Sequence, residues 1–184
     1  GGGTLNTTRI SHSYSPTFII KDKISIKPAL EFTFFQKTMN WDKITRGDMI
    51  DPRYGFIYQT AEVHARSGKS GVDFSGGLLI NSNKWNVGFA AHHITQPDEG
   101  LLGTSKLPIK YTIHSSYTLT PFDSSHFVFT PSFFVMKQHQ FLTYMVNLSC
   151  NYKWISIGTG YRVNDAMLAM IGVNFKFFKI NYNY

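Results

Sequence analysis

The stretch from Ile109 to Thr120 alternates between two kinds of side chain. Its odd positions are mostly isoleucine, tyrosine and leucine, and its even positions are lysine, threonine, histidine and serine. Because successive side chains of a β-strand point to opposite faces, this pattern predicts a strand between an apolar and an aqueous environment. The stretch also reaches the roughly 9 to 11 residues that a tilted strand needs to cross a bilayer.

Similar alternation recurs along the chain and predicts an all-β, antiparallel, up-and-down fold with no helix longer than one turn. We expect residues 1–184 to form a single domain. Pro28 falls inside the second predicted strand, and because proline cannot donate to a ladder, we expect a bulge or a locally unpaired site there. The ten expected strands span residues 7–20, 23–37, 71–81, 84–96, 106–121, 126–137, 140–152, 153–162, 166–175 and 177–184.

Composition narrows the class of protein. Aromatic and charged residues each make up 16% of the 184 residues, a balance that suits sheets and disfavours disorder. No apolar run approaches the roughly 18 residues of a transmembrane helix, and the richest run, at 166–173, stops well short. A membrane helix is therefore not expected, whereas a membrane barrel needs only alternating strands.

The formal net charge is +7, but lysine and arginine are scattered singly at strand ends and turns. Nucleic-acid binding would require a basic patch or stripe, so we expect no nucleic-acid partner. Basic residues at strand ends suit anionic lipid headgroups instead. The single Cys150 offers neither a disulfide within the chain nor a metal cluster, and it lies in the apolar register of its strand.

Histidine and serine residues raise the question of metal binding or catalysis. His92 and His93 are adjacent on one predicted strand, so they face opposite sides and cannot jointly hold one metal. A catalytic triad is a spatial arrangement that sequence spacing does not establish. Ser11, His114 and Ser116 are therefore interpreted as ordinary polar groups of a lumen or loop. We expect no enzyme activity, no metal and no cofactor.

When the connections between the expected strands are numbered along the chain, the odd-numbered and even-numbered ones differ in length. Both long loops, 38–70 and 97–108, are even-numbered connections and lie at one end of a meander, whereas the odd-numbered connections are all short. Short turns at one end and longer loops at the other are typical of outer-membrane barrels, in which the short turns are periplasmic. An aromatic girdle at the short-turn end would comprise Trp85, Phe122, Trp154 and Phe177.

A soluble barrel or sandwich would show the same alternation with its apolar face turned inward. The many strands of bilayer length and the polar second face favour a transmembrane barrel. Its first strand would begin and its tenth would finish at the long-loop side, whereas a bacterial barrel normally has both termini in the periplasm. This predicts an odd number of further strands beyond each end of the chain and no pairing between the first and tenth strands. The side chains expected to face lipid are Ile109, Tyr111, Ile113, Tyr117, Leu142, Val146, Ile155 and Ile157.

The loop at 38–70 contains more aromatic, acidic and basic side chains than a simple connection requires. Loops above about 12 to 15 residues are often functional. The alternative is a loop that folds over the barrel mouth and packs on itself. A calcium site from three of its aspartates is conceivable, but they lack the EF-hand spacing. The candidate partner-binding residues of this loop are Trp41, Asp42, Asp48, Asp51, Arg53 and Tyr54.

Four stretches in the same order resemble the PorP/SprF family of Bacteroidetes outer-membrane proteins, which are associated with type IX secretion and gliding motility. The stretches are WDKITRGDMIDPRYGF, FSGGLLINSNKWNVGFAAHHITQP, LPIKYTIHSSYTL and GYRVNDAMLAMIGVNFKFFKINYNY. The motif positions of that family correspond here to Trp41, Asp42, Asp51, Pro52, Gly55, His93, Gln96, Pro97, Leu107, Pro108, Asn164 and Asp165.

The resemblance implies a scaffold or anchor in the bacterial outer membrane rather than an enzyme. Partners would be large secreted adhesins or other type IX cargo, further secretion or gliding components, and outer-membrane lipid. Gln96 and Pro97 join the candidate partner-binding residues on this basis. Composition and pattern alone would favour a diffusion porin or small-solute transporter, which remains the alternative.

Overall fold

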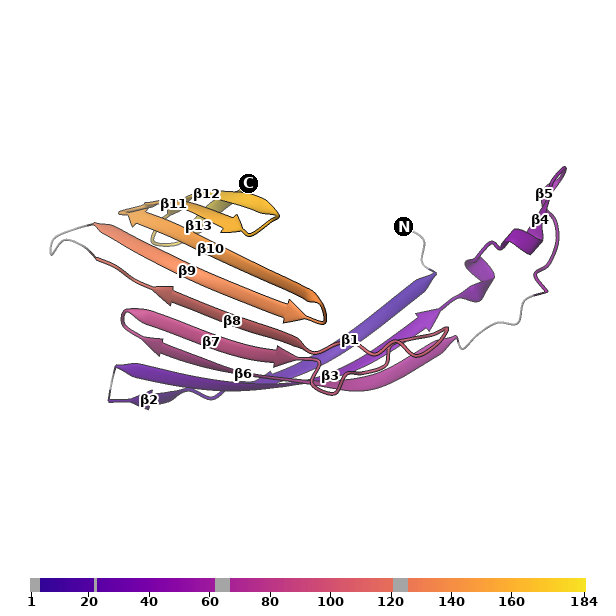
Figure 1. The fold of residues 1–184 in the computed structure, drawn as a ribbon, viewed down its shortest axis with the longest axis horizontal. Coiled ribbons are helices and arrows are strands. Elements are labelled where there is room, and N and C mark those ends of the chain that lie inside the picture. The colour runs from indigo at the N-terminus through magenta and orange to yellow at the C-terminus, as the bar shows by residue number, and fades with distance from the viewer. Residues whose placement is uncertain (1–3, 22, 62–66, 121–125) are drawn as a thin grey trace.

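The structure, a computed structural model, describes residues 4–21, 23–61, 67–120 and 126–184. They form a strongly curved antiparallel sheet of eleven strands (Figure 1). The order across the sheet is β1-β3-β6-β7-β8-β9-β10-β11-β12-β13, and β2 pairs with β3. The strands are β1 (Leu5–Tyr14), β2 (Phe18–Ile20), β3 (Ile24–Met39), β6 (Gly68–Ser82), β7 (Trp85–His92), β8 (Lys110–Tyr117), β9 (Phe127–Gln138), β10 (Phe141–Tyr152), β11 (Ile155–Arg162), β12 (Ala166–Asn174) and β13 (Lys179–Asn183).

The prediction of an all-β meander is confirmed. The helical elements of the described residues are two single 3-10 turns, η1 (Trp41–Lys43) and η2 (Gly47–Met49). None of the helices described has the length and apolar character needed to cross a membrane. Strands β1 and β13 are the two ends of the sheet order, and no ladder joins them in the described residues, in agreement with the parity of the connections.

The first expected strand is broken in two, and the break explains Pro28. Strand β1 ends at Tyr14, opposite Leu30, and β2 resumes at Phe18, opposite Ile26. Pro28 therefore keeps its register with β6 on one side and faces the interruption between β1 and β2 on the other. The locally unpaired site predicted at this proline is confirmed. Proline has no backbone N–H to donate to a neighbouring strand, so no ladder hydrogen bond is sacrificed on the side where β1 and β2 are interrupted.

Three other segments have different bounds in the structure from those predicted from the sequence. The ladder between β3 and β6 continues to Thr38 and Gly68, so the first long loop is shorter than expected. The strand expected at 84–96 ends at His92, because His93 adopts a left-handed backbone with φ of 58° and the chain leaves the sheet. The strand expected at 106–121 is reduced to Lys110–Tyr117.

The register places the apolar and polar side chains on opposite faces of the sheet, named here the apolar face and the polar face. Among the residues expected to face lipid, Ile113 and Val146 lie on the apolar face and stay about half exposed. Phe35, at 1% exposure, is the one large hydrophobic side chain that the described structure buries fully. A soluble sandwich would bury its apolar face, and an exposed apolar surface of this extent is rare on soluble monomers.

Phe35 is buried on the polar face rather than in a core between layers. Its ring lies over Gly71 of the neighbouring strand, where a Cβ atom would approach the ring to 2.7 Å. The guanidinium of Arg9 lies 5.9 Å from the centre of the same ring. Glycine at this position therefore allows an aromatic side chain and a cation to pack flat against the sheet.

Antiparallel order gives the sheet two distinct ends. The turns after β2, β6, β10 and β12 lie at one end, the short-turn end, and the connections after β3 and β7 lie at the other, the long-loop end. In Figure 1 the short turns after β2 and β6 lie at the left. Trp85, Trp154 and Phe177 lie at or beside these short turns, as expected for a girdle, while Phe122 falls outside the described residues.

Candidate partner-binding surface

The first long connection extends away from the sheet. After β3 the chain forms η1 and η2 and then a two-stranded hairpin of β4 (Ile50–Asp51) and β5 (Gly55–Phe56). Residues 41–61, named here the projecting segment, continue beyond the end of β3 at the right of Figure 1. Five of the candidate partner-binding residues, Trp41, Asp48, Asp51, Arg53 and Tyr54, lie on it; Asp42 does too, but its side chain is outside the described structure.

Asp51 fixes the shape of the hairpin tip. Its Oδ1 accepts hydrogen bonds from the backbone N–H of Arg53 at 2.7 Å and of Tyr54 at 2.9 Å, and its Oδ2 accepts one from the Tyr58 hydroxyl at 2.9 Å. The donors at Arg53, Tyr58 and Tyr54 hold the pKa of Asp51 below its usual value. The charged carboxylate therefore acts as a local brace that mimics a backbone turn.

Asp48 performs a similar task at the base of the hairpin. Its carboxylate accepts hydrogen bonds from the Thr60 hydroxyl at 2.8 Å and the Ala61 backbone N–H at 2.9 Å, and these donors lower its pKa. Asp48 and Asp51 are thus engaged by different donors within the segment. No group of three potential metal ligands occurs among the described residues.

The apolar side chains of the hairpin face solvent. Tyr54 is 72% and Phe56 61% exposed, and Ile50, Ile57 and Tyr58 are each about half exposed. Trp41 is different, since it is partly covered and the Arg46 guanidinium lies 5.6 Å from its ring centre. The segment therefore presents an aromatic tip on a hydrogen-bonded base, while Trp41 lies in the first turn after β3 and is partly covered.

The second long connection lies against the polar face. Residues 93–108 are named here the clasp, because acidic side chains attach this segment to three strands. Glu99 accepts from Arg9 of β1 at 2.5 Å and from Lys37 of β3 at 2.9 Å. Asp98 pairs with Lys69 of β6 at 2.5 Å. Register places the three basic side chains in a row on the polar face, and the clasp neutralises them.

A buried polar pair holds the start of the clasp. Asp73 of β6 is only 3% exposed, and its Oδ2 lies 2.6 Å from Nδ1 of His93. The Thr95 hydroxyl donates to the other oxygen of Asp73 at 3.0 Å. A buried carboxylate is tolerated only when it is paired and hydrogen-bonded, so this contact anchors the chain where it leaves the sheet.

The two candidate partner-binding residues of the clasp, Gln96 and Pro97, differ in exposure. Gln96 is exposed and has a left-handed backbone, whereas Pro97 is buried and its carbonyl accepts from the Leu107 N–H. Sequence reasoning missed Arg9, Lys37, Lys69, Asp98 and Glu99 as a group. The available signal was the alternation itself, which places the three basic residues on the polar side of three successive strands, near the same end of the sheet.

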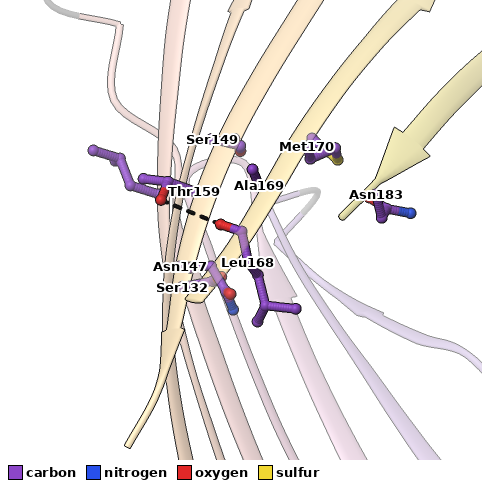
Figure 2. Close-up of a pocket in the computed structure, with 11 residues that line it drawn as sticks. Ser132, Asn147, Ser149, Thr159, Leu168, Ala169, Met170 and Asn183 are labelled. Carbon is purple, nitrogen blue, oxygen red and sulfur yellow. Dashed lines mark hydrogen bonds between the residues drawn. The ribbon is translucent and has the colours of Figure 1, made fainter. Parts of the chain in front are cut away.

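A shallow hollow of about 320 Å³ lies on the sheet across β10, β11 and β12 (Figure 2). Gly160 makes room in its wall for the Asn147 side chain, which would collide with any Cβ atom at that position. The side chains that line it, among them Ser132, Asn147 and Ser149, are uncharged. This neutral hollow carries no chemistry that would select one ligand class.

A comparison with models of protein families shows which family the chain belongs to. The sequence model of the type IX secretion system membrane protein PorP/SprF matches residues 2–184. The chain belongs to the PorP/SprF family. Neither the comparison with curated proteins nor the comparison with solved structures found a significant match. The family description is that of a membrane protein of a secretion system and names no enzymatic activity.

The PorP/SprF description as a membrane protein agrees with an apolar sheet face that no second layer of the described structure covers. The family motif positions named from sequence separate into three groups. Those at 41–55 build the projecting segment, those at 93–108 build the clasp, and Asn164 and Asp165 form the turn between β11 and β12. All three groups lie at the long-loop end of the sheet.

The clasp of this PorP/SprF protein is expected to loosen in acid. Lys69, together with the backbone N–H groups of Ser105 and Gly100, holds the pKa of Asp98 at about 2, below its ordinary 3.8. Because the pKa is depressed in the folded state, the stabilisation by Asp98 is complete above about pH 4 and is lost as the pH falls toward about 2. Hydrogen exchange of residues 98–106, corrected for the intrinsic pH dependence, should accelerate over this window.

Asp98→Asn isolates this carboxylate from the other acids of the clasp. The variant should exchange faster at neutral pH and lose the part of the acid response that Asp98 supplies. Unchanged protection of the parent protein down to about pH 2 would contradict the prediction.

Proposed function

We propose that the sheet is part of the wall of a transmembrane β-barrel in the outer membrane, with the apolar face toward lipid and the polar face toward the lumen. The length of the strands supports this, since β3 has 16 residues, β6 has 15, and β9 and β10 have 12 each. A tilted strand needs roughly 9 to 11 residues to cross the bilayer. Further strands would complete the barrel.

We propose that this barrel is a scaffold and anchor for secreted surface protein, such as a type IX cargo or gliding adhesin, and that the projecting segment is its main contact surface. The observation that carries this proposal is the exposed aromatic tip of Tyr54 and Phe56 on a base braced by Asp51. Aromatic and arginine side chains dominate protein–protein hot spots, and a braced loop loses less entropy on binding. Arg53, beside Tyr54, adds a cation to the same tip.

The clasp has a supporting part in this proposal. Gln96 adds an exposed polar group at the long-loop end, whereas Asp98 and Glu99 are already engaged by lysine and arginine of the sheet. The contact surface would thus be the projecting segment with Gln96 beside it. Contact of other secretion or gliding components at the short turns is the second surface to test.

Replacing Arg53, Tyr54 and Phe56 by alanine tests the anchoring function. Loss of hot-spot side chains should weaken cargo binding about 10- to 100-fold. The measurement is surface retention of the secreted adhesin on cells whose barrel inserts normally. Phe141→Ala is the matched control, because Phe141 is a highly exposed aromatic residue at a different turn of the same end.

Retention that is unaffected in the triple variant would rule out the projecting segment as the contact surface. Retention lost equally in Phe141→Ala would indicate a general defect of this end of the protein. Solute flux through the reconstituted protein, with no co-purifying partner, would favour a porin instead.

A further inference from the structure

Three short turns carry the same pair of residue types. A lysine is followed directly by an aromatic residue between β6 and β7, between β10 and β11, and between β12 and β13. All three turns are at the short-turn end of the sheet. The three pairs are Lys84–Trp85, Lys153–Trp154 and Lys176–Phe177.

The aromatic members continue the apolar face to its edge. Trp85 pairs with Tyr117 in the register of that face. Trp154 stacks on Phe175 with ring centres 6.1 Å apart, and Phe175 contacts Phe178 at 4.9 Å. Phe177 at the tip of its turn is 91% exposed. These rings form a border between the apolar face and the turns, which is the level at which aromatic side chains of membrane proteins meet lipid headgroups.

The lysines of this border lack acidic partners in the described part of the chain. The ion pairs there involve Arg9, Lys37, Lys69 and Arg162, all at the long-loop end. At the short-turn end, the Lys153 ammonium lies 5.4 Å from the Tyr152 ring centre and that of Lys176 lies 5.8 Å from the Phe177 ring centre. Two of the three positive charges therefore lie over aromatic rings at the border of the apolar face.

We propose that Lys84, Lys153 and Lys176 bind the phosphate groups of anionic phospholipids in the leaflet that meets the short-turn end. The lysine ammonium is a compact cation on a flexible stem that reaches the headgroup plane, and the following ring sits at the acyl boundary. A basic residue near an anionic leaflet contributes attraction equivalent to about fivefold enrichment of the anionic lipid. This inference rests on the membrane-spanning sheet and is independent of cargo docking.

The distribution of the pairs favours lipid over a protein partner. A protein–protein hot spot is a compact cluster near the centre of an interface. Here the pairs are repeated on separate turns along the border of the apolar face, so each meets its own headgroup. The two other connections at the short-turn end contain two lysines, Lys21 and Lys23, and two aspartates, Asp22 and Asp123. Both aspartates lie outside the described residues.

Tryptophan fluorescence tests the proposal in the full chain reconstituted into vesicles. The protein has three tryptophans, so Trp41→Phe leaves Trp85 and Trp154 as reporters at the short-turn end. The probes are phosphatidylglycerol and phosphatidylcholine with brominated acyl chains, each added as a minor component to phosphatidylcholine vesicles. Quenching by the brominated phosphatidylglycerol should correspond to about fivefold local enrichment over brominated phosphatidylcholine.

Three variants complete the experiment. Lys84→Gln/Lys153→Gln/Lys176→Gln should abolish the enrichment, and the corresponding triple arginine variant should retain it. Lys43→Gln/Lys106→Gln/Lys137→Gln removes the same charge from other parts of the chain and should also retain it. Equal quenching by both lipids in the parent, or equal loss in the control variant, would overturn the proposal. Unchanged lipid enrichment with loss of a co-purifying protein would assign the lysines to a protein interface and overturn it as well.

Discussion

An arginine in place of Ile113 is expected to destabilise the membrane-inserted protein by about 2 to 4 kcal/mol. Ile113 lies in the middle of β8 on the apolar face, opposite Phe89 and Val135 on the neighbouring strands. A guanidinium at that depth would be surrounded by hydrocarbon, where it has no hydrogen-bond acceptor. The free energy of unfolding of the protein in vesicles, measured by denaturant titration, checks the effect.

The neighbouring position supplies the control for this experiment. Thr112 projects from the polar face and pairs with Ala90 and Met136, so Thr112→Arg should destabilise the protein much less. Two substitutions one residue apart thus differ only in the face that they alter. Equal destabilisation by both, or a larger effect at Thr112, would show that the apolar face is not the lipid-facing one.

Local pattern predicted the sheet because strand periodicity is recorded in neighbouring residues. Alternation located all the long strands of the meander, and Pro28 predicted a bulge or a locally unpaired site, which the gap between β1 and β2 provides. In a sheet without a core between layers, the apolar side chains lie mainly on one face, with few polar residues such as Ser115 and Thr159 among them. The alternation therefore continues along the chain, and the strands can be recognised from the sequence.

The clasp was beyond such reasoning because its contacts join residues far apart in the sequence. Glu99 pairs with Arg9 across 90 positions and with Lys37 across 62. Nothing in the local pattern indicates that the strand expected to reach residue 96 ends at His92. The left-handed backbone of His93 and its contact with Asp73 become visible only when the two strands are placed side by side.

The projecting segment shows an intermediate case. Its unusual composition marked it as a candidate surface, but composition did not distinguish the residues that build it from those that it exposes. Asp48 and Asp51 accept hydrogen bonds within the segment, whereas Tyr54 and Phe56 face solvent. Phe56 was not among the sequence-derived candidates, although its place beside a glycine in a short turn favours exposure.

Replacing His93 by alanine is expected to release the clasp from the sheet. The substitution leaves the carboxylate of Asp73 buried with the Thr95 hydroxyl as its remaining side-chain donor. Removing a hydrogen-bond partner from a buried carboxylate destabilises proteins by about 3 kcal/mol, since the carboxylate stays desolvated. The clasp would then be held by the more exposed ion pairs of Asp98 and Glu99 and by the backbone hydrogen bond from the Ile94 N–H to the Phe74 carbonyl at 2.9 Å.

Hydrogen exchange measures this release directly, because opening of a local segment sets its exchange rate. A change of about 3 kcal/mol should accelerate exchange in residues 93–108 by roughly two orders of magnitude. His92→Ala is the matched control, since the neighbouring ring of His92 makes no hydrogen bond to Asp73 and lies 6.4 Å from the ring centre of His93. If both variants exchange at the parent rate while β6 and β7 stay protected, the buried pair is not what fastens the clasp, and the ion pairs with Arg9, Lys37 and Lys69 hold it together with the backbone hydrogen bond of Ile94.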